Sequence, residues 1–437
     1  MKQSLLIQNA IILDSQSEWN GKNVDIFVVD GLISSIGTGL SVEADLVYDA
    51  KNSTITQGWV DLFGFCPDPG EEFKESLSSY SRAAHQGGFT HAVALCGTHP
   101  KPETASAVRS IIERQRFHDQ QDVFNGQNVH PPRSIYPCEI IPLGLASEDG
   151  KGAELSDMSE LLDAGAVALS DGITGGMSSA YLSKAFEYAK MLNATIMVHP
   201  FDRKMVKGAE IHEGMVSVNL GMKGIPVAAE TSALFNIIEI SEWLDTPVVI
   251  QGISSARSVQ IIQDAKKRGV KIKAIVPVLN LQYNHEILNE FDETFKVLPP
   301  LRTEEDRLAL IEGLMNGTLD GVFSNHTPED VETKKVEFAY AHFGAATLPA
   351  FAHLALNGLN SQQQTIMIDV LTRRNRNVLG WRCNNFEVGE TANFTLFSQS
   401  SNVLKSKSLA YNAVLKNSEC TFSVHATVIN GQLILNN

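Results

Sequence analysis

The sequence predicts an α/β protein built on a closed (β/α)₈ barrel, with a small β-sandwich domain to which both termini contribute. The chain has 437 residues, of which 43% are hydrophobic, so a large core is possible. Strand and helix patterns alternate through the middle of the chain, whereas both ends contain only short strands. We therefore expect residues 1–54 and 380–437 to form the β domain and residues 55–379 to form the barrel.

Eight apolar, strand-like runs occupy the middle of the chain. They are Gly58–Phe65, His91–Leu95, Ile140–Leu145, Ala166–Ser170, Thr195–His199, Val248–Gln251, Lys271–Val276 and Gly321–Ser324. Helical patterns such as Ala256–Arg268 and Glu304–Met315 lie between most of them. Eight strands with intervening helices favour a parallel barrel. A doubly wound open sheet would show the same alternation, so periodicity alone does not choose between them.

The two ends of the chain show strand patterns with hairpin signals. The expected strands are Leu5–Leu13, Val24–Val29, Leu32–Ile36, Asn393–Phe397, Thr421–Val428 and Leu433–Leu435. Asp30-Gly31 and Asn430-Gly431 are typical of tight turns between antiparallel strands. A polar, Pro-containing stretch, Arg116–Pro132, predicts a loop.

Charge and cysteine content restrict the possible partners and the compartment. The formal net charge of −15 argues against nucleic acid or anionic lipid as a partner, because both would repel an acidic surface. The five cysteines include no C-x-x-C pair, which indicates neither a disulfide framework nor a zinc knuckle. No run approaches the roughly 20 apolar residues of a membrane helix. We expect a cytoplasmic protein that binds neither membrane nor nucleic acid.

The carboxyl ends of the strands are where a barrel of this kind places its site. At the end of the first strand, Phe63 and Phe65 are two residues apart and therefore face the same side, whereas Cys66 faces the other. If that side is the barrel axis, two aromatic rings fill it. The other strand ends carry Gly97-Thr98-His99-Pro100, Ser170-Asp171-Gly172, His199-Pro200, Gln251-Gly252, Val278-Leu279-Asn280 and Ser324-Asn325-His326.

Several stretches together resemble the type I dihydroorotases of the amidohydrolase superfamily from end to end. They are Asp61, Asp68-Pro69-Gly70, Gly224–Glu230, Ser258–Val270 and Pro299–Arg307. The resemblance implies a TIM barrel of the metal-dependent hydrolase type. It also implies zinc held by an H-x-H pair, an acid or carboxylated lysine, two further histidines and an aspartate, which together activate water to open a cyclic amide.

Four of these metal-site positions carry other residues here. The H-x-H positions hold Phe63 and Phe65, the second later histidine falls at Gly252, and the catalytic aspartate falls at Asn325. Gln251 is an alternative for the sixth-strand position. An asparagine matches the shape of an aspartate but cannot act as a general base.

Three of the expected polar residues remain. Asp171 matches the fourth-strand acid, His199 the first later histidine, and His326 the histidine that follows the catalytic aspartate. Each also has an ordinary structural interpretation: Asp171 as a turn cap, His199 as a hydrogen-bonded barrel histidine, and His326 as a satisfied loop histidine.

The substrate pocket is changed in the same way. The family's arginine after H-x-H aligns with Pro67, the asparagine of N-T-x-P with Gly97, and the asparagine before P-P-L-R with Leu298. Asn280 completes the expected pocket remnants. Cys66 and Cys96 could be considered as replacement ligands, although Cys66 faces away from the axis on a regular strand.

Zinc requires three or four close ligands, and the aligned positions offer two, Asp171 and His199. We therefore expect no catalytic residues and no cofactor. The resemblance implies that the protein supports aspartate transcarbamoylase as a structural or regulatory partner. It also implies a homodimer or a larger assembly. The alternative is an active dihydroorotase or related zinc-dependent cyclic amidohydrolase with an altered site. A small-molecule sensor that uses the old pocket is a third possibility.

Overall fold

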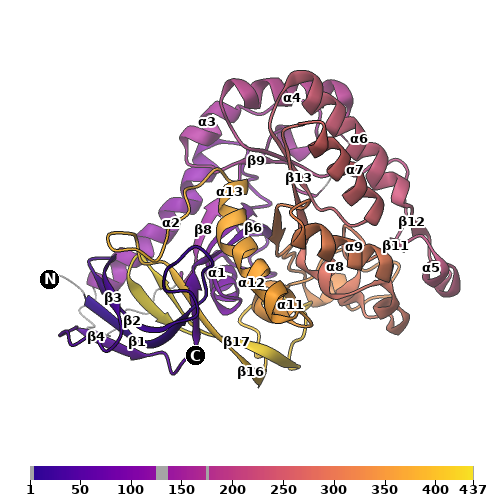
Figure 1. Cartoon of the computed structure of the whole chain (residues 1–437). Helices are drawn as coiled ribbons and strands as arrows, with labels where there is room; N and C mark the ends of the chain where they lie inside the picture. The colour runs from indigo at the N-terminus through magenta and orange to yellow at the C-terminus, as the bar shows by residue number, and fades with distance from the viewer. Residues whose placement is uncertain (1–3, 125–135, 174–176, 437) are drawn as a thin grey trace.

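The computed structural model describes residues 4–124, 136–173 and 177–436, and their central feature is a parallel eight-stranded barrel (Figure 1). The barrel strands are β6 (Trp59–Cys66), β7 (Phe89–Cys96), β8 (Glu139–Pro142), β9 (Leu169–Ser170), β10 (Ile196–Val198), β13 (Val248–Gln251), β14 (Ile272–Pro277) and β15 (Gly321–Phe323). All eight predicted barrel strands are thus present, because each is an apolar run long enough to bury both faces.

Regular pairing gives two parallel sheets, β6-β7-β8 and β15-β14-β13-β10-β9. Two isolated parallel bridges join them. Gly144 pairs with Leu169 after β8, and Gly64 of β6 pairs with His326 after β15. The sheet is therefore closed, which excludes the doubly wound alternative.

Helices follow the barrel strands and form an outer arc in Figure 1. They are α1 (Leu77–Gln86), α2 (Ala105–Phe124), α3 (Met158–Asp163), α4 (Ser179–Met191), α6 (Val227–Leu244), α7 (Ala256–Lys267), α8 (Val278–Gln282), α9 (Glu304–Met315), α10 (Val331–Lys334), α11 (Phe351–Leu356), α12 (Ser361–Asp369) and α13 (Asn375–Val378). A projecting insertion holds β11 (Ile211–His212), α5 (Met215–Leu220) and β12 (Gly224–Ile225). The loop predicted for Arg116–Pro132 is wrong up to Phe124, since α2 continues through these residues; residues 125–132 lie outside the described ones.

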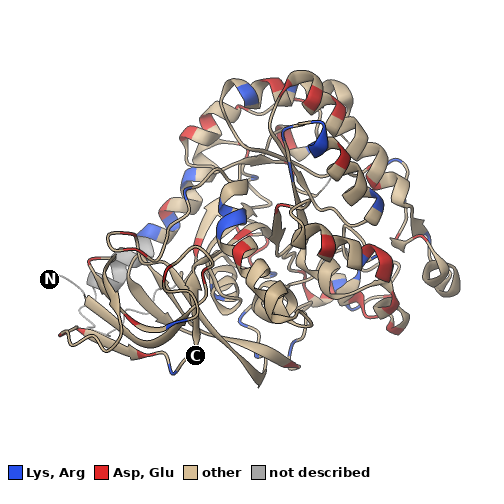
Figure 2. Ribbon diagram, in the orientation of Figure 1, with Lys and Arg blue, Asp and Glu red and all other residues tan. Residues whose placement is uncertain are grey.

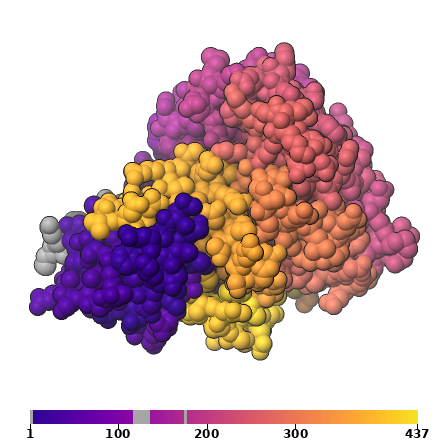
Figure 3. Space-filling model, in the orientation of Figure 1, coloured from indigo at the N-terminus to yellow at the C-terminus, as the bar shows by residue number. Residues whose placement is uncertain are grey.

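Strands from both ends of the chain form the second sheet, and the two ends lie side by side in Figure 3. Its strands are β1 (Ser4–Ile12), β2 (Asn23–Val29), β3 (Leu32–Gly37), β4 (Leu46–Asp49), β5 (Thr54–Gln57), β16 (Phe394–Val403), β17 (Glu419–Ile429) and β18 (Gln432–Leu435). The sheet forks at β1, which pairs with β2 and, on its other edge, with β4 and then β5. One apolar core of 17 buried residues, from Leu5 to Leu433, belongs to this domain.

Two further apolar cores separate the inside of the barrel from its outside. The inner core includes Val60, Phe63, Met197, Val249 and Phe323, whereas the outer core packs the helices against the other faces of the same strands. Positions of Lys, Arg, Asp and Glu are frequent along the helices that surround the barrel (Figure 2). In the described part of the chain, no helix is long and apolar enough to cross a membrane.

Candidate functional site at the barrel mouth

Two phenylalanines of β6 occupy the axis of the barrel at its mouth. Phe63 is buried in the inner core, and its ring meets that of Phe323 edge to face with centroids 6.0 Å apart. Phe65 is half-buried and packs on the same core. Cys66 belongs to the outer core instead, which confirms that it faces away from the axis. The positions of the expected H-x-H pair therefore supply apolar packing and no ligand atom.

Asp171 lies at the end of β9, and its carboxylate accepts hydrogen bonds from neighbouring elements. The backbone N–H of Ser147 donates at 2.8 Å and the hydroxyl of Tyr181 at 3.0 Å. Burial raises the pKa of Asp171, while these donors oppose the rise. The turn after β9 is capped by Ser170, whose hydroxyl accepts from the N–H of Gly172. Asp171 is thus held by α4 and by the loop after β8.

His199 follows β10 and is 3% exposed. Its Nδ1 lies 2.8 Å from the carbonyl oxygen of Gln251, and its ring stacks on that of Phe201 with centroids 5.5 Å apart. Burial lowers the pKa of His199 to about 4, so the ring is neutral at pH 7. Within the described residues, its Nε2 has no hydrogen-bond partner.

Gly252 stands where the resemblance places the other histidine, and its backbone resists a side chain. Its φ is +85°, and a Cβ there would lie 2.9 Å from His199 Nδ1. Both the left-handed backbone and the close approach of His199 favour glycine. Gln251, the alternative for this position, is buried, and its carbonyl is the group that His199 contacts.

Two asparagines, Asn325 and Asn280, bond to backbone carbonyl groups of the loop that contains Leu298. The Nδ2 of Asn325 donates to the carbonyl of Leu298 at 3.0 Å, and the Nδ2 of Asn280 donates to that of Pro300 at 2.9 Å. The side-chain oxygens of both asparagines are buried and have no partner in the part of the chain that is described. Both amides thus tie down the loop before α9.

His326 faces the helix side of the barrel rather than its mouth. It is fully buried, its Nδ1 accepts from the N–H of Leu348, and its Nε2 donates to Glu75 at 3.4 Å. Glu75 also accepts from Ser79, Ser408 and the N–H of Leu409. His326 is therefore a satisfied structural histidine, and no sequence pattern pointed to its partner Glu75, which is 251 residues away.

Pro67 and Gly97 adjoin the ends of β6 and β7. Pro67 is buried, and the N–H of Gly97 donates to the carbonyl of Cys66 at 2.8 Å. Gly97 has φ +93°, and a Cβ there would lie 2.6 Å from the carbonyl oxygen of Pro100. Neither position leaves room for the arginine or asparagine that the family would place there.

A buried charged network, not singled out from the sequence as a unit, lies beneath the loop that contains Arg302. Arg302 and Glu230 are 2% and 1% exposed and pair at 3.2 Å. The Arg302 Nε donates to Ser254, and its Nη1 lies 3.0 Å from His212 Nδ1. Glu230 also accepts the N–H groups of Ser254 and Ser255 at 3.1 Å each. The motifs Gly224–Glu230 and Pro299–Arg307 meet in this network.

The donor set does not fit the zinc that the resemblance implies. Of the aligned positions, Asp171 and His199 alone offer side-chain ligands, and both already make hydrogen bonds. Among the described residues, no group of three or more His, Cys, Asp or Glu side chains is placed to hold a metal ion. Because zinc requires three or four ligands, no catalytic step through a metal follows from these residues.

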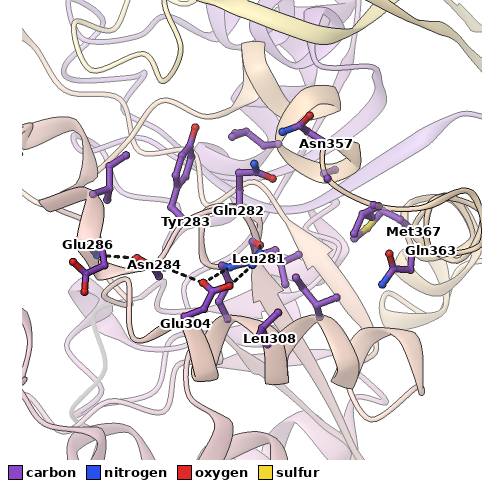
Figure 4. Close-up of a pocket in the computed structure, with 17 residues that line it drawn as sticks. Leu281, Gln282, Tyr283, Asn284, Glu286, Glu304, Leu308, Asn357, Gln363 and Met367 are labelled. Atoms are coloured by element: carbon purple, nitrogen blue, oxygen red, sulfur yellow. Dashed lines mark hydrogen bonds and ion pairs between the residues drawn. The ribbon is translucent and has the colours of Figure 1, made fainter.

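Two cavities show where a small molecule could enter. One of about 250 Å³ lies beside His199 between α4 and α6. Another of about 710 Å³ lies between α8, α9, α11 and α12 (Figure 4). In the larger cavity, Glu304 is engaged by Arg307 and Asn284. Its lining contains none of the site residues predicted from the sequence, whereas His199 lines the smaller cavity and Leu298 lines a further cavity of about 600 Å³.

A closed parallel barrel joined to a β domain from both termini is the fold of the hydantoinases. L-hydantoinase (dihydropyrimidinase) from Arthrobacter aurescens superposes with a TM-score of 0.81 and 18% identity, covering 100% of this chain and 96% of that one. D-hydantoinase from a Thermus species superposes with a TM-score of 0.76 and 16% identity over 99% of this chain and 95% of its own. At these identities, the likeness establishes the fold.

Sequence comparison identifies the family. Residues 53–255 match the family described as "Dihydro-orotase-like". A dihydroorotase of Acetivibrio thermocellus is 31% identical over 99% of both chains, and one of Ruminiclostridium cellulolyticum is 32% identical over 90% of this chain and 88% of its own. The chain therefore belongs to the dihydroorotase-like amidohydrolase family.

Proposed function

We propose that the chain is a non-catalytic member of this family that acts as a structural or regulatory partner of aspartate transcarbamoylase. The observation that carries the proposal is the apolar mouth of the barrel, where Phe63 and Phe65 pack at the expected H-x-H positions. The mouth has no set of ligands for a metal that would activate water, and Asn325 cannot act as a general base.

The neighbouring backbone supports the same conclusion. Gly252 cannot accept a histidine without moving His199, and Gly97 cannot accept a substrate-binding asparagine without moving Pro100. The loss of a single metal ligand would not by itself change the residues at positions 97 and 252. At Phe63 and Phe65 the mouth is packed in a form that needs no metal, since buried ligand atoms lacking partners would cost about 1–3 kcal/mol each at these positions.

The proposed partner comes from the family rather than from a surface of this chain. Because a barrel can lose its chemistry and keep its outer surface, a non-catalytic member can still assemble with aspartate transcarbamoylase. Assembly as a homodimer or larger oligomer and a cytoplasmic location are part of the proposal.

The test combines three measurements on the full-length protein. We expect less than about 0.1 zinc per chain by elemental analysis, no turnover of dihydroorotate, and co-elution with co-expressed aspartate transcarbamoylase. About one zinc per chain together with turnover would overturn the non-catalytic assignment. Separate elution at micromolar concentrations would overturn the partner assignment, so the two parts can fail independently.

A second candidate function is an active, zinc-dependent cyclic amidohydrolase with an altered site. It is favoured by the two donors that remain at the mouth, Asp171 and His199, and by the relatives named dihydroorotase. It predicts zinc-dependent ring opening that is abolished by both Asp171→Asn and His199→Phe. The same elemental analysis separates it from the first proposal.

A further inference from the structure

A cavity of about 430 Å³ lies where β16 and β17 of the β domain meet α11 of the barrel, which packs on β17 (Figure 1). Its apolar wall consists of Pro349, Ala350, Ala352, Val403, Leu404, Cys420, Phe422 and Val424. Its polar lining residues are Gln86, His353, Asn402, Lys405, Ser406, Lys407, Ser423 and Asn436. None of them is a residue predicted for the barrel mouth. Pockets that bind small molecules usually combine an apolar wall with a few polar groups in this way.

The charge of this lining is opposite to that of the chain. The described lining residues include two lysines and no Asp or Glu, although the chain carries a net charge of −15. Arg82, one helical turn before Gln86 on α1, brings a third positive charge near Lys407. In the described part of the chain, none of Arg82, Lys405 and Lys407 makes an ion pair with a carboxylate. The cavity is therefore a positively charged site on an acidic protein.

Hydrogen bonds fix the segment that carries the two lysines. The Nε2 of Gln86 donates to the carbonyl of Lys405 at 2.7 Å, and its Oε1 accepts the N–H of Lys407 at 2.8 Å. The Nζ of Lys407 donates to the Oδ1 of Asn436 at 2.8 Å. Both lysines thus leave a backbone that is anchored to the end of α1. A site held in this way loses little conformational entropy when a ligand binds.

The surroundings of Lys407 favour the approach of a negative charge. The side chain is half-buried, and burial first, and then the charge of Arg82, lower its pKa. Both causes act because they make the charged ammonium less favourable. An anion beside the ammonium offsets both, since it replaces lost hydration and opposes the repulsion between the two cations.

We propose that this cavity binds a small organic anion, whose carboxylate or phosphate group meets Lys405 and Lys407 and whose apolar body packs on the wall. An ammonium group acts as a point charge, so the shared chemistry is an anionic group of oxygen atoms. The inference concerns a site away from the barrel mouth, and it holds whether or not the chain is catalytic.

Benzoate and benzamide are the matched probes, because benzamide keeps the ring and replaces the carboxylate with an uncharged amide. The full chain is titrated with each compound by calorimetry. We expect benzoate to bind at least about fivefold more tightly than benzamide, and to lose most of this advantage in about 0.5 M NaCl, which screens charges. Equal affinities at low salt, or no binding of benzoate at millimolar concentration, would overturn the proposal.

Two further probes define the ligand. Phenyl phosphate distinguishes the two anionic groups: tighter binding than that of benzoate assigns a phosphate, and weaker binding assigns a carboxylate. Inorganic phosphate has the charge without the apolar body, so it should bind more weakly than phenyl phosphate. Equal binding of these two phosphates would refute the role of the apolar wall.

Variants locate the effect in the cavity. Lys405→Gln and Lys407→Gln should each weaken the binding of benzoate by about threefold or more, because each removes one positive charge. Lys184→Gln, at an exposed lysine of α4, should leave the affinity unchanged. Lys405 is exposed, so its variant keeps the test open if Lys407→Gln does not fold. Benzoate binding that is unchanged in the Lys405→Gln variant and in every folded Lys407 variant would place the site elsewhere and refute the assignment.

Discussion

The barrel mouth and the network around Arg302 are two regions of the same barrel that differ in how their side chains are packed. At the mouth, Phe63 and Phe65 pack on the inner core, and a Cβ at Gly252 would lie 2.9 Å from His199 Nδ1. In the network, Arg302 and Glu230 remain paired and nearly every polar atom around them has a partner. One region is packed with aromatic rings, whereas the other holds a buried ion pair.

The difference shows what offsets the free-energy cost of burying the polar groups in each region. Metal ligands are compensated by the metal, so without it they become buried polar groups that lack partners, and apolar residues are then more stable. Arg302 and Glu230 compensate each other, so removing either alone leaves an unpaired buried charge. A network of mutually paired charges is therefore stable without a bound metal, whereas a set of buried metal ligands is not.

The largest effect is expected from breaking the buried ion pair. Arg302→Met should lower the free energy of unfolding by about 3–5 kcal/mol, because Glu230 would remain charged and buried. Urea denaturation followed by circular dichroism measures the loss. The double variant Arg302→Met/Glu230→Gln should lose less than the sum of the two single variants. Additive losses would contradict the idea that the two groups compensate each other.

A second test reintroduces a ligand at the mouth. Phe63→His should cost roughly 2–4 kcal/mol, since it removes buried aromatic packing and adds a polar group without a partner. Urea denaturation with and without zinc checks this, and zinc should not recover the loss. Phe63→Leu is the control and should cost less than about 2 kcal/mol. Full recovery by zinc would show that a metal site still exists.

A third, smaller effect separates backbone strain from the contact with His199. Gly252 and Gly317 have φ of +85° and +82°, but a Cβ at Gly317 would meet open space. Alanine at either position pays the backbone strain of roughly 1 kcal/mol, and at Gly252 it also displaces His199. Gly252→Ala should therefore be less stable than Gly317→Ala by about 1 kcal/mol in denaturant melts. Equal losses of stability would mean that the His199 ring can move aside without a cost in free energy.

The smallest effect concerns Asp61, a polar residue of β6 that remains just below the mouth. It is fully buried, it accepts from Ser324, and burial raises its pKa to about 7. A carboxyl group with a raised pKa binds more protons in the folded state, so its stabilising contribution is complete below pH 4 and is lost as the pH rises through 7. Asp61→Asn should reduce the slope of the free energy of unfolding against pH by about 1 kcal/mol per pH unit or less.

That slope is measured by urea denaturation between pH 4.5 and 7.5. Comparison with Asp68→Asn, at another buried carboxylate near the end of β6, serves as the control, because Asp68 is paired with Arg114 at 2.5 Å. An unchanged slope in Asp61→Asn would show that Asp61 stays ionised in the folded protein.

Local pattern allowed most of the fold to be predicted. Strands such as Val248–Gln251 and helices such as Glu304–Met315 coincide with the structure, because apolar runs and helical periodicity are written in neighbouring residues. The loop predicted from Arg116 was wrong up to Phe124, since a polar composition does not exclude a helix. The domain boundaries at residues 54 and 379 stay a prediction.

The sequence by itself determined that the mouth of the barrel holds Phe63 and Phe65 on one face, because side chains alternate along a strand. Tertiary structure alone decided that Gln251 fixes the proton of His199, that Gly252 has no room for a side chain, and that Glu75 holds His326. These contacts join residues far apart in the chain, so their geometry depends on how the closed barrel brings the strand ends together.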